Sequence, residues 1–263
     1  MWECTKSKPW YWSITEVQAE KKLSILHAWS RKQFCKTMGW SWKSKPIWFN
    51  TIHKEKEMNA QEFWNSFETY KDLLMDIDSA EKGEAEALLQ RLDNDLKQYS
   101  EGIDFVLGDL SDKGRTLTFT CEGDTDYFDD VITLCEQSPV LDFWEIEAFR
   151  PAKGADVAIT FEKYHLKSKN LWFIPLESEE ESDKFGLRVA LDEYEQDNED
   201  LLIAVYSLIE QMLGEYDTAT TLGYLELCPL GDNMKEEGFS PLCDLPEYLE
   251  WFLNNGENVS SER

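Results

Sequence analysis

Residues 103–121 read IDFVLGDLSDKGRTLTFTC and contain the signals of a β-hairpin. Two runs rich in β-branched and aromatic residues flank SDKG at 111–114, a sequence typical of a turn. In the second run Leu117, Phe119 and Cys121 alternate with threonines, so these three side chains lie on one face of the strand. We therefore predict a hairpin with one buried face and one solvent-exposed face.

The same order of elements is expected twice along the chain. The first set, at about 103–149, consists of the hairpin, a helix with its apolar stripe at 128–135, and a strand in FWEIEAF at 143–149. A second hairpin–helix–strand set follows at about 170–228, which suggests an internal duplication. We predict an α+β fold: a two-layer domain in which helices cover one side of a mainly antiparallel sheet.

Amphipathic helices are predicted on either side of these units. Apolar residues recur at helical spacing in 59–78 and again in 81–99, so a helical hairpin opens the domain. Asp244 precedes a closing helix, and Glu247 completes a pair that resembles a capping box. The two opening stripes consist of Phe63, Phe67, Tyr70, Leu74 and Ile77, and of Ala85, Leu88, Leu92, Leu96 and Tyr99.

The charge of the chain changes sign at Met58. Residues 1–57 contain 11 Lys and Arg against 5 Asp and Glu, a balance of +6, whereas residues 58–263 contain 15 against 48, a balance of −33. The basic, Trp-rich residues 1–57 follow no helical or strand period, so we predict a poorly ordered extension or a mis-assigned start. The alternative is an arm that stacks on bases or lies at a membrane interface. The expected organisation is then a single acidic domain at 58–254 and a flexible tail at 255–263.

Composition narrows the classes of partner and cofactor. A strongly acidic domain repels phosphate, so we expect neither nucleic acid nor a membrane as its partner. No run reaches the roughly 18 apolar residues of a membrane span, and the first residues lack the apolar run of a signal peptide. The six cysteines include no C-x-x-C pair, which argues against a zinc-finger site. We expect a cytoplasmic protein with reduced thiols and no cofactor.

Three segments together resemble a known family. They are EFWNSF at 62–67, LCEQSPVLDFWEIEAFRP at 134–151 and LGEYDTATTLGYLEL at 213–227. The combination is similar to a family of uncharacterised bacterial proteins of about 200 residues, within the size range of single domains. Its members have an FW-x-x-F first helix, a W-x-x-x-AFR strand and an LGE-x-D segment. The resemblance covers about 62–230 and implies a domain boundary but no activity.

Two acidic residues on one strand are the first candidate site. Glu145 and Glu147 lie two residues apart, so both carboxylates emerge on the same face. Such a pair can act as acid and base, or can hold a hard metal ion. We favour the alternative, an exposed strand face on which Arg150 or Arg188 neutralises the charge, because no histidine or third carboxylate is tied to the pair by spacing.

The second candidate is the segment LGEYD at 213–217, predicted as a loop between a helix and a strand. Glu215 and Asp217 can present binding groups there. We favour a structural role, in which Asp217 forms an Asx turn or bonds backbone amides at the junction. The candidate surface cluster therefore comprises Glu145, Glu147, Arg150, Glu215 and Asp217.

No catalytic or metal-binding residue is assigned. The acidic run at 123–130 lacks the glycine and the glutamate that an EF-hand loop needs, so its aspartates are interpreted as helix caps. His165 is the one histidine after Met58, and the chain contains no G-x-S-x-G, P-loop or G-x-G-x-x-G motif.

Two functional hypotheses follow. The first is a non-enzymatic interaction domain that binds a basic protein, as an immunity protein or antitoxin binds a cationic toxin. The alternative is a metal-assisted or acid–base enzyme, which requires Glu145, Glu147, Glu215 and Asp217 to converge in one cleft. A domain that mediates only self-assembly is a third possibility.

Overall fold

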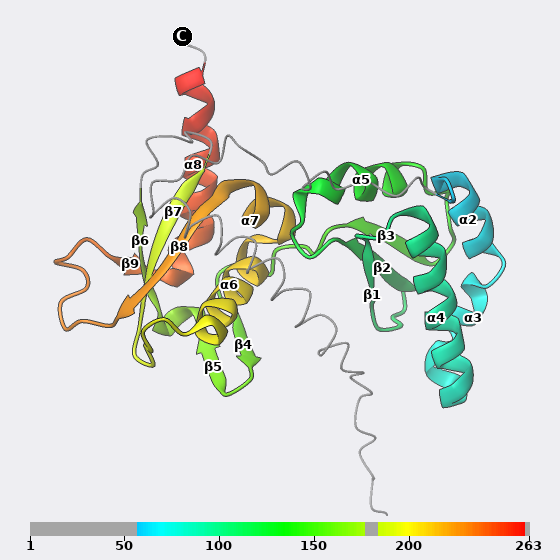
Figure 1. Cartoon of the computed structure of the whole chain (residues 1–263), viewed down its shortest axis with the longest axis horizontal. Helices are drawn as coiled ribbons and strands as arrows, with labels where there is room; N and C mark the ends of the chain where they lie inside the picture. Colours follow the sequence, from blue (N-terminus) through cyan, green and yellow to red (C-terminus); the bar gives the residue numbers. More distant parts are fainter. Residues whose placement is uncertain (1–56, 177–183, 261–263) are drawn as a thin grey trace, which may run out of the picture. The chain divides into compact units, whose positions relative to one another are not determined.

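The computed structural model of the chain describes residues 57–176 and 184–260, with the side chains of 255–260 left aside (Figure 1). The predictions for residues 1–56 concern a segment outside the described residues. We refer to the elements by the labels of Figure 1.

Three helices open the described chain and form the predicted helical hairpin. Asn59 caps the first helix, and its side chain and that of Glu62 each bond the other residue's backbone amide in a capping box. The first arm is interrupted near Thr69, so it consists of two helices rather than one. The helices are α2 (Ala60–Glu68), α3 (Lys71–Met75) and α4 (Lys82–Tyr99), with a 3-10 turn at Ile77–Ser79 before α4.

The first hairpin–helix–strand unit follows. Its hairpin is antiparallel, with Phe105 opposite Phe119, and its third strand pairs in parallel with the second, with Leu117 opposite Ile146. The strand order is β1-β2-β3. The elements are β1 (Asp104–Leu107), β2 (Arg115–Thr120), α5 (Phe128–Glu136) and β3 (Trp144–Ala148).

The second unit has the same strand pairing and the same order, except that two α-helices precede its last strand. Its hairpin is antiparallel, with Phe173 opposite Val189, and its last strand pairs in parallel with the middle one, with Val189 opposite Leu227. The predicted repetition is therefore present in the topology. The elements are β6 (Trp172–Leu176), β7 (Phe185–Leu191), α6 (Glu199–Leu213), α7 (Glu215–Thr221) and β8 (Leu222–Pro229).

Further elements lie outside the two units. A separate hairpin is formed by β4 (Ala158–Phe161) and β5 (Tyr164–Lys167), and the short β9 (Ser240–Pro241) pairs with the start of β6. The closing helix α8 (Leu245–Ser260) begins directly after Asp244, as predicted, and runs into the segment that we expected to be a tail from residue 255. Within the described ranges, no helix combines the length and the apolar composition that a bilayer span requires.

An aromatic core joins the opening helices to the first sheet. Phe63 and Phe67 are fully buried, and their rings make edge-to-face contacts with Phe119 and Trp144 at centroid distances of 5.8 and 5.3 Å. The indole nitrogen of Trp64 donates to the carbonyl of Leu134, 2.8 Å away, so α5 is tied to the same core. The sheet is thus covered by the helices that the apolar stripes predicted.

One prediction about β2 is wrong. We expected its threonine face to be exposed, but Thr118 and Thr120 are buried, with 6% and 0% of their surface accessible. The hydroxyl of Thr118 bonds Glu147 on β3, and that of Thr120 bonds Glu215 on α7. Alternation showed which residues share a face, but it carried no information on what covers the second face.

We predict that Phe67→Ala lowers the free energy of unfolding by about 3–5 kcal/mol, because it removes a fully buried ring and leaves a cavity. Urea denaturation measures this loss. The control is Leu73→Ala: Leu73 is 60% exposed, and its substitution should change stability by no more than about 0.5 kcal/mol. Equal losses for the two variants would contradict the assignment of this core.

Candidate functional site

Glu215 is positioned by a sharp junction between two helices. Gly214 ends α6 with φ +88° and ψ 159°, and α7 begins at the next residue. A Cβ on Gly214 would lie 3.0 Å from the backbone nitrogen of Ala152, so both the left-handed φ and the close approach favour glycine. The backbone amide of Glu215 donates to the carbonyl of Arg150, 2.9 Å away.

The carboxylate of Glu215 accepts hydrogen bonds from two separate segments of the chain, residues 120–123 and Arg150. Glu215 has no accessible surface. Its donors are the Thr120 hydroxyl at 2.6 Å and the backbone amides of Cys121, Gly123 and Arg150 at 3.0, 3.0 and 3.1 Å. A carboxylate has about four lone-pair directions, so these donors occupy its accepting capacity.

Arg150 brings further carboxylates to the same place. Its two terminal nitrogens bond both oxygens of Glu122 at 3.0 Å, and one of them also bonds Glu210. Its Nε lies 3.5 Å from Glu215, a distance at which the attraction is ionic. We call Glu122, Arg150, Glu210 and Glu215 the Arg150 cluster. The side chains of its three glutamates are 2%, 6% and 0% exposed.

The Arg150 cluster is strongly polarised. Burial by itself lowers the pKa of Arg150, but the charges of Glu210, Glu122 and Glu215 outweigh it, and the pKa of the guanidinium is raised. Burial, reinforced by the charge of Glu215, raises the pKa of the neighbouring Cys121 thiol. The guanidinium therefore stays charged and the thiol stays protonated at neutral pH.

Two residues at this cluster have a strained backbone conformation. Glu122 and Phe149 adopt the left-handed region, with φ of 56° and 66°. Such conformations cost residues with a Cβ about 1–2 kcal/mol each. Glu122 supplies a partner of Arg150 and Phe149 directly precedes Arg150, so the hydrogen bonds of the cluster hold both residues in place.

The structure separates the predicted candidate residues into two groups. Arg150 and Glu215 meet, as described. Glu147 instead bonds Thr118 at 2.9 Å, and Glu145 is exposed on β3. Arg188 forms an ion pair with Glu226 on β8, and does not pair with either acid of β3.

Two predictions for the segment 213–217 are wrong. It is a helix junction and not a loop, because α7 starts at Glu215. The residue that bonds backbone amides there is Glu215 and not Asp217. Asp217 lies in the first turn of α7 and is half-buried, and this burial raises its pKa above the ordinary value of 3.8.

Glu122 and Glu210 were absent from the sequence-based cluster. Glu210 lies within the apolar run LLIAVYSLIEQML, on the buried side of α6. A charged residue on the apolar face of a helix indicates a buried ion pair, and this signal could have identified Glu210 as a site residue. Glu122 lies in the turn after β2, where nothing in the local sequence indicates an ionic partner.

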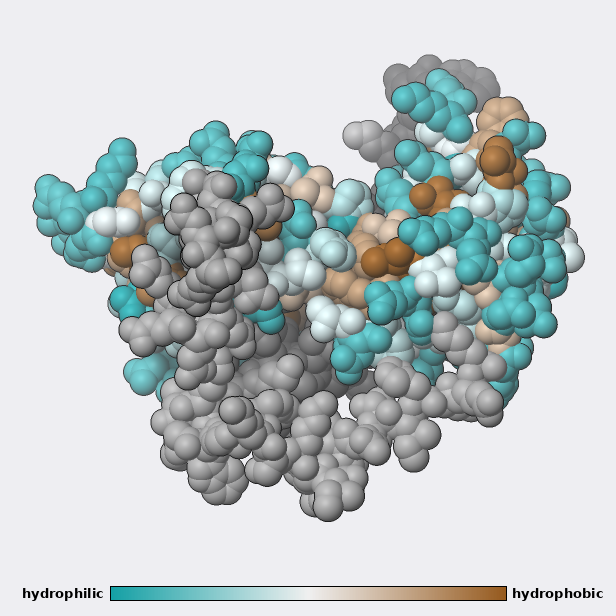
Figure 2. All heavy atoms as spheres, turned by 90° about the horizontal axis from the view of Figure 1, so that it is seen from above, coloured by the Kyte–Doolittle hydropathy of each residue, from teal (hydrophilic) through white to brown (hydrophobic). Residues whose placement is uncertain are grey.

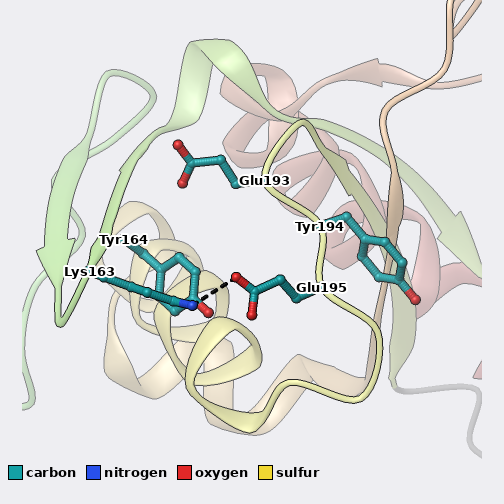
Figure 3. A pocket seen from close by; sticks show the side chains of 5 residues that line it. All are labelled: Lys163, Tyr164, Glu193, Tyr194 and Glu195. Atoms are coloured by element: carbon teal, nitrogen blue, oxygen red, sulfur yellow. Dashed lines mark hydrogen bonds and ion pairs between the residues drawn. The ribbon is translucent and has the colours of Figure 1, made fainter.

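A hollow of about 320 Å³ lies elsewhere on the surface, lined by Lys163, Tyr164, Glu193, Tyr194 and Glu195 (Figure 3). The Lys163 ammonium and the Glu195 carboxylate are 2.8 Å apart. Within residues 57–176 and 184–260, no three His, Cys, Asp or Glu side chains are grouped so that they could hold a metal ion.

No family model, no curated protein and no solved structure matches the chain. The resemblance to a family of uncharacterised bacterial proteins therefore stays a prediction.

We predict that Glu215→Gln lowers the free energy of unfolding by about 3 kcal/mol or more. The glutamine side chain has the same volume, but its NH2 group would face the buried N–H and O–H groups that donate to Glu215 in the wild type. The substitution also removes one of the three carboxylates that surround Arg150. Thermal or urea unfolding measures this, with Glu145→Gln as the control, since Glu145 is exposed. The structural role would be disproved if both substitutions had the same small effect.

A pH series tests the environment of Asp217. Its pKa is raised in the folded protein, so the folded state binds more protons than the unfolded state between the two pKa values. The stability of the wild type relative to Asp217→Asn should therefore increase as pH falls from 7 through the folded pKa. Thermal unfolding between pH 3 and pH 7 measures the difference, and Asp129→Asn, in the exposed first turn of α5, is the control. A decrease would show that the pKa is lowered.

Proposed function

We propose that the described domain is a non-enzymatic interaction domain that binds a basic protein, in the manner of an immunity protein or an antitoxin. The observation that carries this proposal is the balance of 15 basic to 48 acidic residues over 58–263. Such a charge produces a negative potential that attracts cationic surfaces, accelerates their association and repels nucleic acid.

The way the chain uses its cations supports the proposal. Arg115 pairs with Asp78, Arg150 lies within its cluster, and Arg188 pairs with Glu226. Each of these guanidinium groups is paired with an acid of the chain, and 15 cations over 58–263 can match at most 15 of the 48 acids.

Acidic side chains are concentrated before α6. Residues 192–200 include Asp192, Glu193, Glu195, Asp197 and Glu199, all of them exposed. Among the described atoms in Figure 2, hydrophilic residues predominate on the face shown and hydrophobic ones occur in small groups. A surface of this kind favours a partner that is recognised by charge over one recognised by a broad apolar interface.

The contacts of the candidate acids do not support the alternative, a carboxylate-based enzyme. Glu215 was one of its four required acids, and its carboxylate is buried and bonded to four donors. An acid in this state cannot reach a substrate or exchange a proton with it.

The test is capture followed by kinetics. The tagged full chain is used to retain proteins from a native lysate at low and moderate salt, and the eluate is identified by mass spectrometry. An unrelated protein of similar net charge, used as bait in parallel, reveals proteins that are retained by charge alone. For a partner specific to this chain, we expect the association rate constant to fall at least about ten-fold as ionic strength rises from roughly 0.02 to 0.2 M. An association rate that does not change with salt would contradict the proposal.

A further inference from the structure

The hollow in Figure 3 combines groups from two segments that are distant in sequence. Lys163 lies in the turn of the β4–β5 hairpin and Tyr164 is the first residue of β5, whereas Glu193 and Glu195 come from the loop between β7 and α6. The side chains of Glu193 and Glu195 extend towards the side on which Lys163 and Tyr164 lie, and Lys163 extends to meet Glu195, whereas the ring of Tyr194 points away from them (Figure 3).

The hydroxyl of Tyr164 is an unused polar group at the base of this hollow. Tyr164 is 2% exposed, and its Oη has no hydrogen-bond partner among the residues that the structure describes. Lys163 and Glu195 lie beside this hydroxyl and interact with it electrostatically, but neither makes a hydrogen bond of ordinary length and angle to it. A buried hydroxyl without a partner is unfavourable, so this position is suited to a polar ligand.

The charge of the hollow indicates which ligand fits. The Lys163 ammonium lies 2.8 Å from Glu195 and 5.1 Å from the centroid of the Tyr164 ring, a combination of acid and aromatic ring that binds cations. The second oxygen of Glu195 accepts from the Asn198 side chain at 2.6 Å, which orients the carboxylate. Glu193 makes no ion pair or hydrogen bond to any described side chain.

We propose that this hollow binds an arginine side chain of the basic partner. The inference rests on the proposed function and names the group that is recognised. The guanidinium would take the position of the Lys163 ammonium, donate to Glu193 and Glu195, and donate to the Tyr164 hydroxyl. A planar group with five donors can engage several acceptors at once, which a single ammonium does less well. The exposed pair of Lys163 and Glu195 is weak enough to be displaced.

The tripeptide acetyl-Gly-Arg-Gly-amide is the probe, and the citrulline peptide is its neutral control. Binding to the ¹⁵N-labelled full chain is followed by NMR at low salt. We expect the amides of residues 162–165 and 193–198 to shift with the arginine peptide and to stay in place with the citrulline peptide.

Variants localise the binding. Glu193→Gln with Glu195→Gln should raise the Kd about five-fold or more, because each exposed ion pair contributes up to about that factor. The matched control, Glu236→Gln with Glu237→Gln, removes the same charge from exposed residues and should change the Kd less than about two-fold. Lys163→Met should lower the Kd more than Lys167→Met, since both remove one exposed lysine but only Lys163 occupies the hollow.

Tyr164→Phe separates recognition from stability. It should raise the Kd while leaving the melting temperature unchanged or higher, because the buried hydroxyl has no partner to lose. Three results would each overturn this inference. The first is that both double glutamate substitutions weaken binding equally. The others are chemical-shift changes that do not concentrate at the hollow, and no binding of the arginine peptide at low salt. The salt dependence of partner association decides the proposed function separately, so the two can fail independently.

Discussion

The buried carboxylate of Glu215 connects the two hairpin–helix–strand units of the domain. It lies at the start of α7, in the second unit, and its donors lie in the first unit: one at the end of β2, two in the turn that follows, and one just after β3. Arg150 adds Glu122 and Glu210 to the same cluster. A single side chain thus fixes the ends of two parallel strands against a helix junction, and the strained residues Glu122 and Phe149 are held where these elements meet.

An ionic cluster of this kind contributes specificity more than net stability. Removing three carboxylates and a guanidinium from water is unfavourable, and apolar side chains of similar volume often stabilise a fold as well. The cluster differs from an apolar contact in being directional: Glu215 fits only where four donors converge. We therefore interpret it as the device that selects one packing of the two units. This role also accounts for Glu215, an acid that was a candidate site residue in the sequence and is fully buried in the structure.

The charges inside and outside the domain have different roles. Within the Arg150 cluster each carboxylate is bonded to a donor, whereas the acids of 192–200 are exposed. Lys163, which pairs with Glu195 of this segment, lies over the buried Tyr164, whose hydroxyl has no hydrogen-bond partner among the described residues. We propose that the exposed acids of 192–200 take part in the recognition of a basic protein. The buried charges of the Arg150 cluster fix the packing of the fold.

Local periodicity was sufficient to predict the helical hairpin, the strands of the two hairpin–helix–strand units and their repeated order, because each depends on which residues share a face, but β5 and β9 were not predicted. Periodicity did not predict burial or local structure that depends on a residue distant in sequence. Thr120 is buried because Glu215 covers it, a contact across 95 residues. The sequence EYDTATT was predicted to begin in a loop since Gly214 ends α6, yet it forms α7, in which Thr218 and Thr221 bond backbone carbonyls one turn earlier. The hollow was missed because its two halves lie about thirty residues apart and neither contains a motif.

Native-state hydrogen exchange tests most directly whether Glu215 makes the two units one cooperative structure. The amides of Cys121, Gly123 and Arg150, which bond Glu215, are compared with amides in the centre of β2 and of β7. We predict that all these amides exchange with the same free energy of opening, equal to that of global unfolding, because neither unit opens without the other. Two results together would contradict this prediction. The β2 and β7 amides would exchange with two distinct free energies of opening, and the three amides that bond Glu215 would exchange with a free energy well below both.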